Sequence, residues 1–322
     1  MMKTNVASLM DYFYEQMYGD LKILEKDRLV IVSKLQKTAL ILIILSLITL
    51  IFLTSRLLFP FLHALVLVST FSFLVYLFIY RHQSAGYRLL FKEEVIAKIV
   101  QFIDPSLQYQ SENHISENEY AMSELFLDDF DRFSGNDLVQ GTINGVALKF
   151  SDLNVEKKIE DRERKEHWVS IFQGLFFVAD FNKKISHKTF VLPDTAGNTL
   201  GVLGEWMQGL DKRWGEFVRL DNTTFERYFV VYGDQIESRY ILSSSLMERI
   251  IAFKEKTGKS LYISFVNSKM YLCVDYKKDL FEPILTQSLL DFAPIKDYFQ
   301  LLSHVLGIVE AFKLDEKIWS KR

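Results

Sequence analysis

Two short groups of polar residues follow apolar, strand-like stretches and carry the side chains best suited to chemistry. The first group is Asp180, Asn182 and Lys183, and the second is Asp234, Gln235, Glu237 and Arg239. Carboxylates, amides and cations at strand ends can line a polar groove and hold a ligand or a partner by hydrogen bonds and charge. The same residue types also make tight turns and surface ion pairs, and this is the interpretation that we favour for both groups.

The chain contains no sequence motif that identifies a reaction or a cofactor. A phosphate-binding loop ending in Gly-Lys-Ser or Gly-Lys-Thr, a Gly-x-Gly-x-x-Gly turn, a His-Glu-x-x-His helix and a Gly-x-Ser-x-Gly turn are all absent. The run Asp128-Asp129-Phe130-Asp131 lacks the regular ligand spacing, the glycine and the terminal glutamate of a calcium loop. We therefore expect no catalytic, metal-binding or cofactor-binding residue. An enzyme would require the fold to bring scattered acids to His167 or His187.

Composition limits the partners and the compartment. The net charge is -3 and the sequence pI is about 6.1, which gives no general attraction to nucleic acid. The one cysteine, Cys273, cannot form an intramolecular disulfide, in agreement with a reducing compartment. It lies in the apolar alternating stretch 261–274, where we expect it to act as a small buried hydrophobe.

Two uncharged apolar stretches, residues 38–55 and 57–80, fix the location of the chain. Their 18 and 24 residues can each form a helix that crosses a hydrocarbon core of about 30 Å. The short connection around Arg56 and Pro60 leaves room only for a tight turn, so the two helices should form a hairpin. The alternative, a buried hairpin in a soluble core, fits such uninterrupted apolarity less well.

Lysine and arginine residues near the two stretches predict the orientation of the hairpin. Positive charges gather before the first stretch and after the second, while the turn has only Arg56. We therefore expect both termini to be cytoplasmic. The residues counted are Lys22, Lys26, Arg28, Lys34 and Lys37 before the hairpin, and Arg81, Arg88, Lys92 and Lys98 after it.

Helical periodicity continues on both sides of the hairpin and predicts that residues 20–37 pair with residues 82–103 as antiparallel helices. Asp104-Pro105 supplies a helix stop. We divide the chain into an N-terminal cytoplasmic helix (residues 1–37), a transmembrane hairpin (38–80), a juxtamembrane helix (81–104) and a cytoplasmic domain (105–322).

The domain after residue 105 is predicted to be antiparallel α+β, because strand hairpins alternate with helices that are too few for parallel crossovers. Asn144-Gly145 predicts a tight hairpin between 138–143 and 146–153. Residues 168–181 and 189–192 suggest a second strand pair, and 260–265 with 270–274 a third. Helices are expected at 116–126 behind a capping box, at 197–210, at 246–256 and at about 294–313. The charged stretch 157–167 is interpreted as an exposed loop or a long hairpin connection.

Several segments carry a family resemblance. These are residues 172–183 (Phe-Gln-Gly-Leu-Phe-Phe-Val-Ala-Asp-Phe-Asn-Lys), 229–242 (Phe-Val-Val-Tyr-Gly-Asp-Gln-Ile-Glu-Ser-Arg-Tyr-Ile-Leu), 246–249 (Leu-Met-Glu-Arg) and 262–267 (Tyr-Ile-Ser-Phe-Val-Asn). Together they resemble a bacterial family of membrane-hairpin proteins catalogued as domain of unknown function 3137, over the chain from the hairpin to about Pro283. The resemblance implies an inner-membrane protein with a cytoplasmic domain and points to LemA-type membrane proteins as companions. It brings no activity, cofactor or catalytic residue.

Three hypotheses about function follow. The leading one is a membrane-anchored, non-enzymatic scaffold or adaptor whose α+β domain binds another protein at the inner membrane, with the lipid bilayer as a second partner and homo-oligomers left open. The second is a sensory domain that holds a small molecule among Asp180, Lys183, Asp234, Glu237 and Arg239. The third is an enzyme of unrecognised type.

Overall fold

The computed structural model describes residues 5–56, 61–126, 129–161, 164–181, 185–194, 214–312 and 314 of the 322-residue chain. Contacts between residues divide the chain into two compact units. The helical unit comprises residues 5–99 and 282–299, and the sheet unit comprises residues 100–281 together with the stretch that begins at Gln300. Within the described residues, the chain passes between the units at three points.

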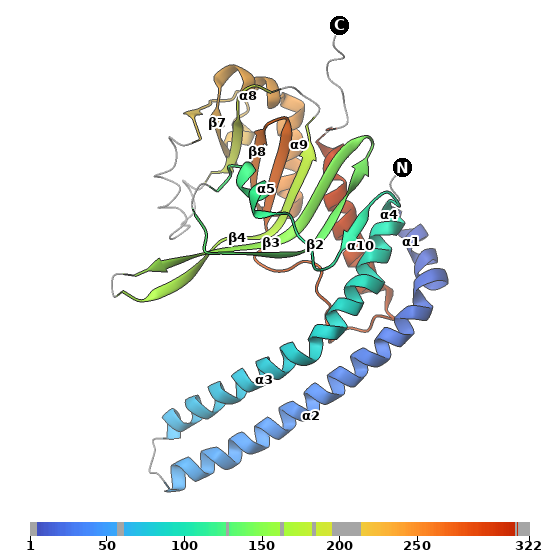
Figure 1. The fold of residues 1–322 in the computed structure, drawn as a ribbon, viewed down its shortest axis with the longest axis vertical. Helices are drawn as coiled ribbons and strands as arrows, with labels where there is room; N and C mark the ends of the chain where they lie inside the picture. Colours follow the sequence, from blue (N-terminus) through green and yellow to red (C-terminus); the bar gives the residue numbers. More distant parts are fainter. Residues whose placement is uncertain are drawn as a thin grey trace. The chain divides into compact units, whose positions relative to one another are not determined.

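Two long helical runs form most of the helical unit. The first run is α1 (Val6–Tyr12), the π-helical turn η1 (Phe13–Met17) and α2 (Tyr18–Arg56); the second is α3 (Phe61–Phe91), the π-helical turn η2 (Lys92–Ile96) and the start of α4 (Ala97–Ile103). They run side by side in opposite directions (Figure 1). Lys98 Nζ lies 2.5 Å from Asp20 Oδ2 across the pair. The predicted pairing of residues 20–37 with 82–103 is confirmed.

Helices α2 and α3 expose large apolar side chains along the uncharged stretches. Phe71 and Phe78, for example, are 70% and 71% exposed. Both helices are long and apolar enough to cross a membrane. Across the pair, Ser46 Oγ and Ser72 Oγ share a hydrogen bond of 2.6 Å. The predicted turn at Pro60 lies outside the described residues.

The sheet unit contains a nine-stranded sheet among its described residues, in the order β1-β2-β3-β4-β9-β8-β5-β7-β6. Every pair of neighbouring strands is antiparallel, and helices lie on the sheet, which confirms the α+β fold. The strands are β1 (Gln108–Gln110), β2 (Arg132–Ile143), β3 (Val146–Glu160), β4 (Glu166–Asp180), β5 (Thr189–Pro193), β6 (Glu216–Phe217), β7 (Phe229–Gly233), β8 (Ser260–Val266) and β9 (Lys269–Asp275).

Two tight turns set the hairpins that the sequence predicts. Asn144 and Gly145 have φ angles of 51° and 80° and join β2 to β3, as a type I′ turn requires. Asn267 and Ser268, with φ angles of 51° and 58°, join β8 to β9. The predicted pairing of 168–181 with 189–192 is wrong, because β9 and β8 lie between β4 and β5. An alternating apolar pattern defines a strand but not its neighbour.

Both faces of the central strands are buried, because helices lie on each side. Alternate residues of β4, β8 and β9 pack into an aromatic core around Tyr120 of α5 (Glu117–Met122). The other residues of these strands face the side on which Figure 1 shows α9 (Ser244–Thr257). The remaining helices are α7 (Thr223–Glu226), α8 (Gln235–Ile241), α10 (Phe292–Leu306) and α11 (Ile308–Ala311).

Local capping signals were predicted well. Ser116 Oγ accepts a hydrogen bond from the Glu119 amide at the start of α5, and Ser243 Oγ accepts one from Leu246 at the start of α9. Gly258 ends α9 in the left-handed conformation with φ 64°. The C-terminal helix predicted at 294–313 is divided at Gly307 into α10 and α11. The helix predicted at 197–210 lies outside the described residues.

Candidate functional site

The first predicted polar group is only partly described. Asp180 is the exposed last residue of β4 and stands opposite Lys269 in the ladder with β9. It lines an open hollow of about 410 Å³ together with Lys149 and Lys269. Glu119 of α5 binds the ammonium groups of both lysines, at 3.6 Å from Lys269. Asn182 and Lys183 lie outside the described residues.

The second predicted group lies at the start of α8. Asp234 caps this helix, because its Oδ1 accepts hydrogen bonds from the amides of Ile236 (3.0 Å) and Glu237 (2.8 Å). The hydrogen bond from the Glu237 amide lowers the pKa of Asp234. The carboxylate therefore serves the turn chemistry that we favoured.

Glu237 fastens α8 to the segment that leads into β5. Its carboxylate accepts hydrogen bonds from the amides of Ser186 and His187, both at 2.6 Å. The imidazole Nδ1 of His187 lies 2.8 Å from the same carboxylate. Three contacts from one short segment thus converge on a side chain that is only 14% exposed.

The other two predicted residues of α8 bind backbone carbonyls near β6. Gln235 Nε2 donates to Phe217 O at 2.8 Å, and Arg239 Nη2 donates to Arg219 O at 3.0 Å. The polar side chains of α8 therefore join this helix to two neighbouring segments of the sheet unit. These contacts are structural.

The two predicted groups are far apart on the sheet. Asp180 ends β4, whereas Asp234 follows β7, and β9, β8 and β5 lie between these strands. Four strand spacings of about 4.8 Å place them about 19 Å apart across the sheet. The structure brings Asp234, Gln235, Glu237 and Arg239 together on α8, but it does not bring Asp180 to them.

Two open hollows border α8. The larger, of about 620 Å³, lies beside Arg239, Asn222 and Ser243. The other, of about 560 Å³, is lined by Asp234, Gln235, His187 and Trp214.

Contacts among Trp214, Glu124 and Lys188 stiffen the wall of the 560 Å³ hollow. The Trp214 indole donates to Glu124 O at 2.9 Å, and Lys188 Nζ lies 2.6 Å from the Glu124 carboxylate. This hollow is thus the place where several predicted polar residues share a concave surface.

The histidines and the cysteine make separate contacts. His167 Nε2 lies 2.8 Å from Asp161, and His187 is bound to Glu237 as described above. Within the described ranges, no three His, Cys, Asp or Glu side chains gather in a way that could hold a metal ion. Cys273 is fully buried, which confirms its predicted packing role, and burial raises the pKa of its thiol.

Residues 157–160 and 166–167 lie in a projecting β-ribbon, whereas the charged stretch 157–167 was predicted to be an exposed loop or a long hairpin connection. Residues 157–160 of β3 pair only with β4, because β2 ends opposite Glu156 and β9 ends opposite Gly174. Figure 1 shows this two-stranded ribbon extending beyond the other strands. Trp168, 42% exposed, lies on the ribbon under the guanidinium group of Arg132, whose carbon is 3.7 Å from the ring centroid. The alternation of charged residues with Ile159 and Val169 was the available signal.

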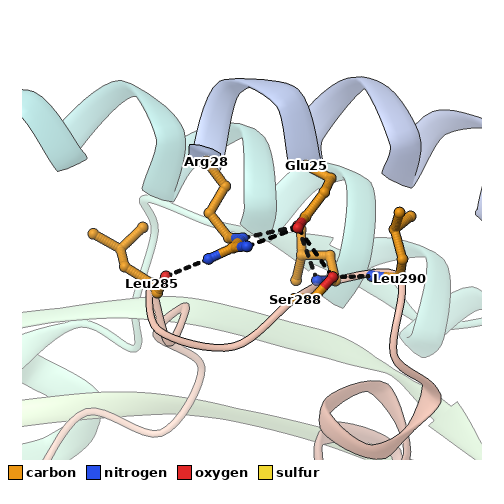
Figure 2. Close-up of polar contacts among 6 residues, drawn as sticks. Glu25, Arg28, Leu285, Ser288 and Leu290 are labelled. Atoms are coloured by element: carbon orange, nitrogen blue, oxygen red, sulfur yellow. Dashed lines mark hydrogen bonds and ion pairs between the residues drawn. The ribbon is translucent and has the colours of Figure 1, made fainter. Parts of the chain in front are cut away.

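A buried polar cluster lies in the helical unit (Figure 2). Glu25 and Arg28 of α2 are each 7% exposed and form a double hydrogen bond of 2.7 and 2.8 Å. Arg28 Nη1 donates to Leu285 O at 2.6 Å, while Glu25 accepts from Ser288 Oγ and from the Leu289 amide at 3.0 and 3.1 Å. Residues from opposite ends of the chain therefore complete one network.

The pKa values of this pair favour the charged forms. Burial raises the pKa of Glu25, but hydrogen bonds from Arg28, Leu289 and Ser288 outweigh burial and lower it. The hydrogen bond to Glu25 raises the pKa of Arg28. The sequence indicates Arg28 as one of the basic residues that orient the hairpin, but it does not indicate the buried partners of Arg28.

Comparison with known proteins finds a family model that matches one segment of the chain. Residues 170–314 match the family model described as Protein of unknown function (DUF3137), which confirms the resemblance over that segment. It runs from within β4 past the end of α11, so it includes α8, the lining of the 620 Å³ hollow, and the lining of the 560 Å³ hollow except Glu124. No curated protein and no solved structure matches the chain.

Proposed function

We propose that this chain is a membrane-anchored scaffold or adaptor whose α+β unit binds another protein at the bacterial inner membrane. Helices α2 and α3 support the anchor, because both are long, apolar and exposed over uncharged stretches. Lysines and arginines outnumber acids beside these stretches, which supports the placement of both termini in the cytoplasm.

The projecting ribbon carries the proposal of protein binding. Tryptophan and arginine contribute more than most residues to the affinity of protein interfaces. Trp168 and Arg132 already stack on each other, so little side-chain freedom remains to be lost when a partner docks. One ion pair and one hydrogen bond stiffen the ribbon further. The Lys158 ammonium group pairs with Glu166 across the strands, and the Asp131 carboxylate accepts a hydrogen bond from the Lys158 backbone amide. A LemA-type membrane protein is the first candidate partner.

A pull-down of the full chain from detergent-solubilised membranes tests this proposal. We expect Trp168→Ala to lower the amount of co-purified partner about tenfold or more, as for an interface hot spot. Ile236→Ala is the matched control, because Ile236 is 83% exposed on α8, away from the ribbon. The proposal fails if the chain is recovered alone or if Trp168→Ala keeps its partner. A partner of another class would exclude only the LemA-type candidate.

A second candidate function is the binding of a small ligand, favoured by the 560 Å³ hollow beside α8. Its lining offers a carboxylate, an amide and an indole, from Asp234, Gln235 and Trp214. A thermal-shift screen of the full chain in detergent, with nucleotides, lipid headgroups and metal ions, tests it. We expect the ligand to raise Tm in the natural chain but less in Gln235→Ala. No shift with any compound would remove this candidate.

A further inference from the structure

Residues 282–299 form a strap within the helical unit. They leave the sheet unit after Phe281, contact both helical runs and return to the sheet unit at Gln300, within α10. The contacts of the strap with the two helical runs lie inside the helical unit. The strap therefore belongs to the helical unit, although its residues lie near the other end of the sequence from the two helical runs.

The strap is held to the first helical run by charge and by aromatic packing. Arg28 binds the backbone of the strap at Leu285, and Glu25 binds it at Ser288 and Leu289. Phe13 of η1 packs edge-on against Phe292, with ring centroids 5.5 Å apart. Figure 2 shows the polar part of this attachment.

The strap is also held to the second helical run, through different residues. Glu282 receives ion pairs from Arg88 Nε at 2.8 Å and from Lys92 Nζ at 3.0 Å. Tyr298 closes this end, because its hydroxyl donates to Glu282 O at 2.6 Å and its ring packs on Phe91 at 5.4 Å. One segment thus bridges the two helices, with separate anchors on each.

These attachments cannot loosen one at a time at low cost. Glu25 and Arg28 are buried charges, and each neutralises the other while also binding the strap. Removing one partner of a buried pair leaves an uncompensated charge in a dry environment. Lys92 is likewise buried, with a side chain that is 4% exposed. Release of the strap must therefore admit water to all of these charges together.

We propose that residues 282–299 act as a conformational clasp, which closes only on the paired helical runs and opens in a single step when they separate. Movement of α2 away from α3 would pull the anchors at Arg28 and Lys92 apart, so that the strap cannot keep both.

Cysteine labelling of the full chain in lipid vesicles tests the clasp. Leu289 is 4% exposed, so a Leu289→Cys variant reacts with a water-soluble maleimide only when the strap opens. The chain without this substitution gives the background, because its Cys273 is fully buried. We expect Glu25→Gln to speed labelling about tenfold or more, since Arg28 loses its counter-charge.

Asp20→Asn is the matched control. It breaks the contact between Asp20 and Lys98, which joins the same two helical runs without touching the strap. Labelling of Leu289→Cys with Asp20→Asn added should stay at the rate of Leu289→Cys alone. Unchanged labelling in Glu25→Gln, or equal acceleration by both substitutions, would overturn the proposal.

A second measurement tests whether opening of the strap depends on the separation of α2 from α3. The hydroxyls of Ser46 and Ser72 are 2.6 Å apart, so the double substitution Ser46→Cys and Ser72→Cys allows oxidation to join α2 to α3. In the Glu25→Gln background we expect this cross-link to slow labelling of the Leu289→Cys site several-fold. If the rate is the same before and after oxidation, the clasp does not respond to separation of the helices and the proposal fails.

Discussion

Glu237 is the residue on which most polar contacts of α8 depend. It receives two amide hydrogen bonds and one imidazole contact from a segment that lies 50 to 51 positions away in the sequence. Two backbone donors of the segment before β5 would lose their charged partner if the carboxylate were removed. Hydrogen bonds to charged groups contribute more to stability than neutral ones.

We expect Glu237→Gln to loosen the segment around Ser186 and His187. The amide keeps the size of the side chain but loses the charge, which should cost about 1–2 kcal/mol. Hydrogen exchange of the amides of residues 185–190 measures the effect, because about 1.4 kcal/mol of local stability corresponds to a tenfold faster rate.

Glu248→Gln provides the comparison for Glu237→Gln. Glu248 is exposed on α9, and its neutralisation should change stability by no more than about 0.5 kcal/mol. Exchange at residues 185–190 should remain at its original rate. Equal protection of this segment in the two variants would show that Glu237 does not fasten it.

At the residue scale, the sequence predicted short-range roles better than long-range ones. The capping bonds of Asp234 join it to residues two and three positions away, so residue type and position were enough to suggest them. The contacts of Glu237 and the burial of Arg28 depend on backbone groups brought from distant segments. Residue type alone cannot indicate such partners.

Among the elements, β4 is the strand that joins the two halves of the sheet. It pairs with β3 on one side and β9 on the other, and Gly174 lies where β9 ends. Gly174 has φ 153°, and a Cβ atom there would lie 2.3 Å from Val274 O. The close approach of the two backbones therefore requires glycine at this position.

We expect Gly174→Ala to destabilise the chain by about 3 kcal/mol, because β4 and β9 must move apart to admit the methyl group. The midpoint of thermal unfolding in detergent should fall by about 6–12 °C. Gly86→Ala is the control, since nothing lies within 4 Å of a Cβ added at Gly86 in α3. Equal midpoints for the two variants would contradict this account of Gly174.

Helices and strands were predictable where turn or capping residues next to them in the sequence mark their ends. Asn144-Gly145 fixed one hairpin, and Ser243 with Gly258 marked the two ends of α9. Strand neighbours were not predictable in the same way, since β5 and β8 meet through register contacts such as Val191 with Ile263. The short strand β1 was also missed, because three residues with polar side chains show no apolar alternation.

At the scale of the whole molecule, the fold class followed from the order of hairpins and helices, and the two apolar helices followed from length and composition. The division of the chain into two units did not follow from the sequence in this way. For residues 282–299 the only element predicted was the start of a helix at about residue 294, yet these residues belong with the N-terminal helices. Nothing in a local pattern states that a segment will pack against residues more than 250 positions earlier.

The clasp has a consequence for the time course of biosynthesis. Arg28 and Leu285 are separated by 257 positions. A ribosome that adds roughly 5–20 residues per second makes Leu285 about 13 to 51 s after Arg28. Both helical runs end by Ile103, so they are complete well before Leu285 is made, and until then Glu25 and Arg28 have no strap to bury them. If residues 282–299 act as the proposed clasp, its closure follows the synthesis of both helical runs, and a chain that stops before residue 285 can never complete it.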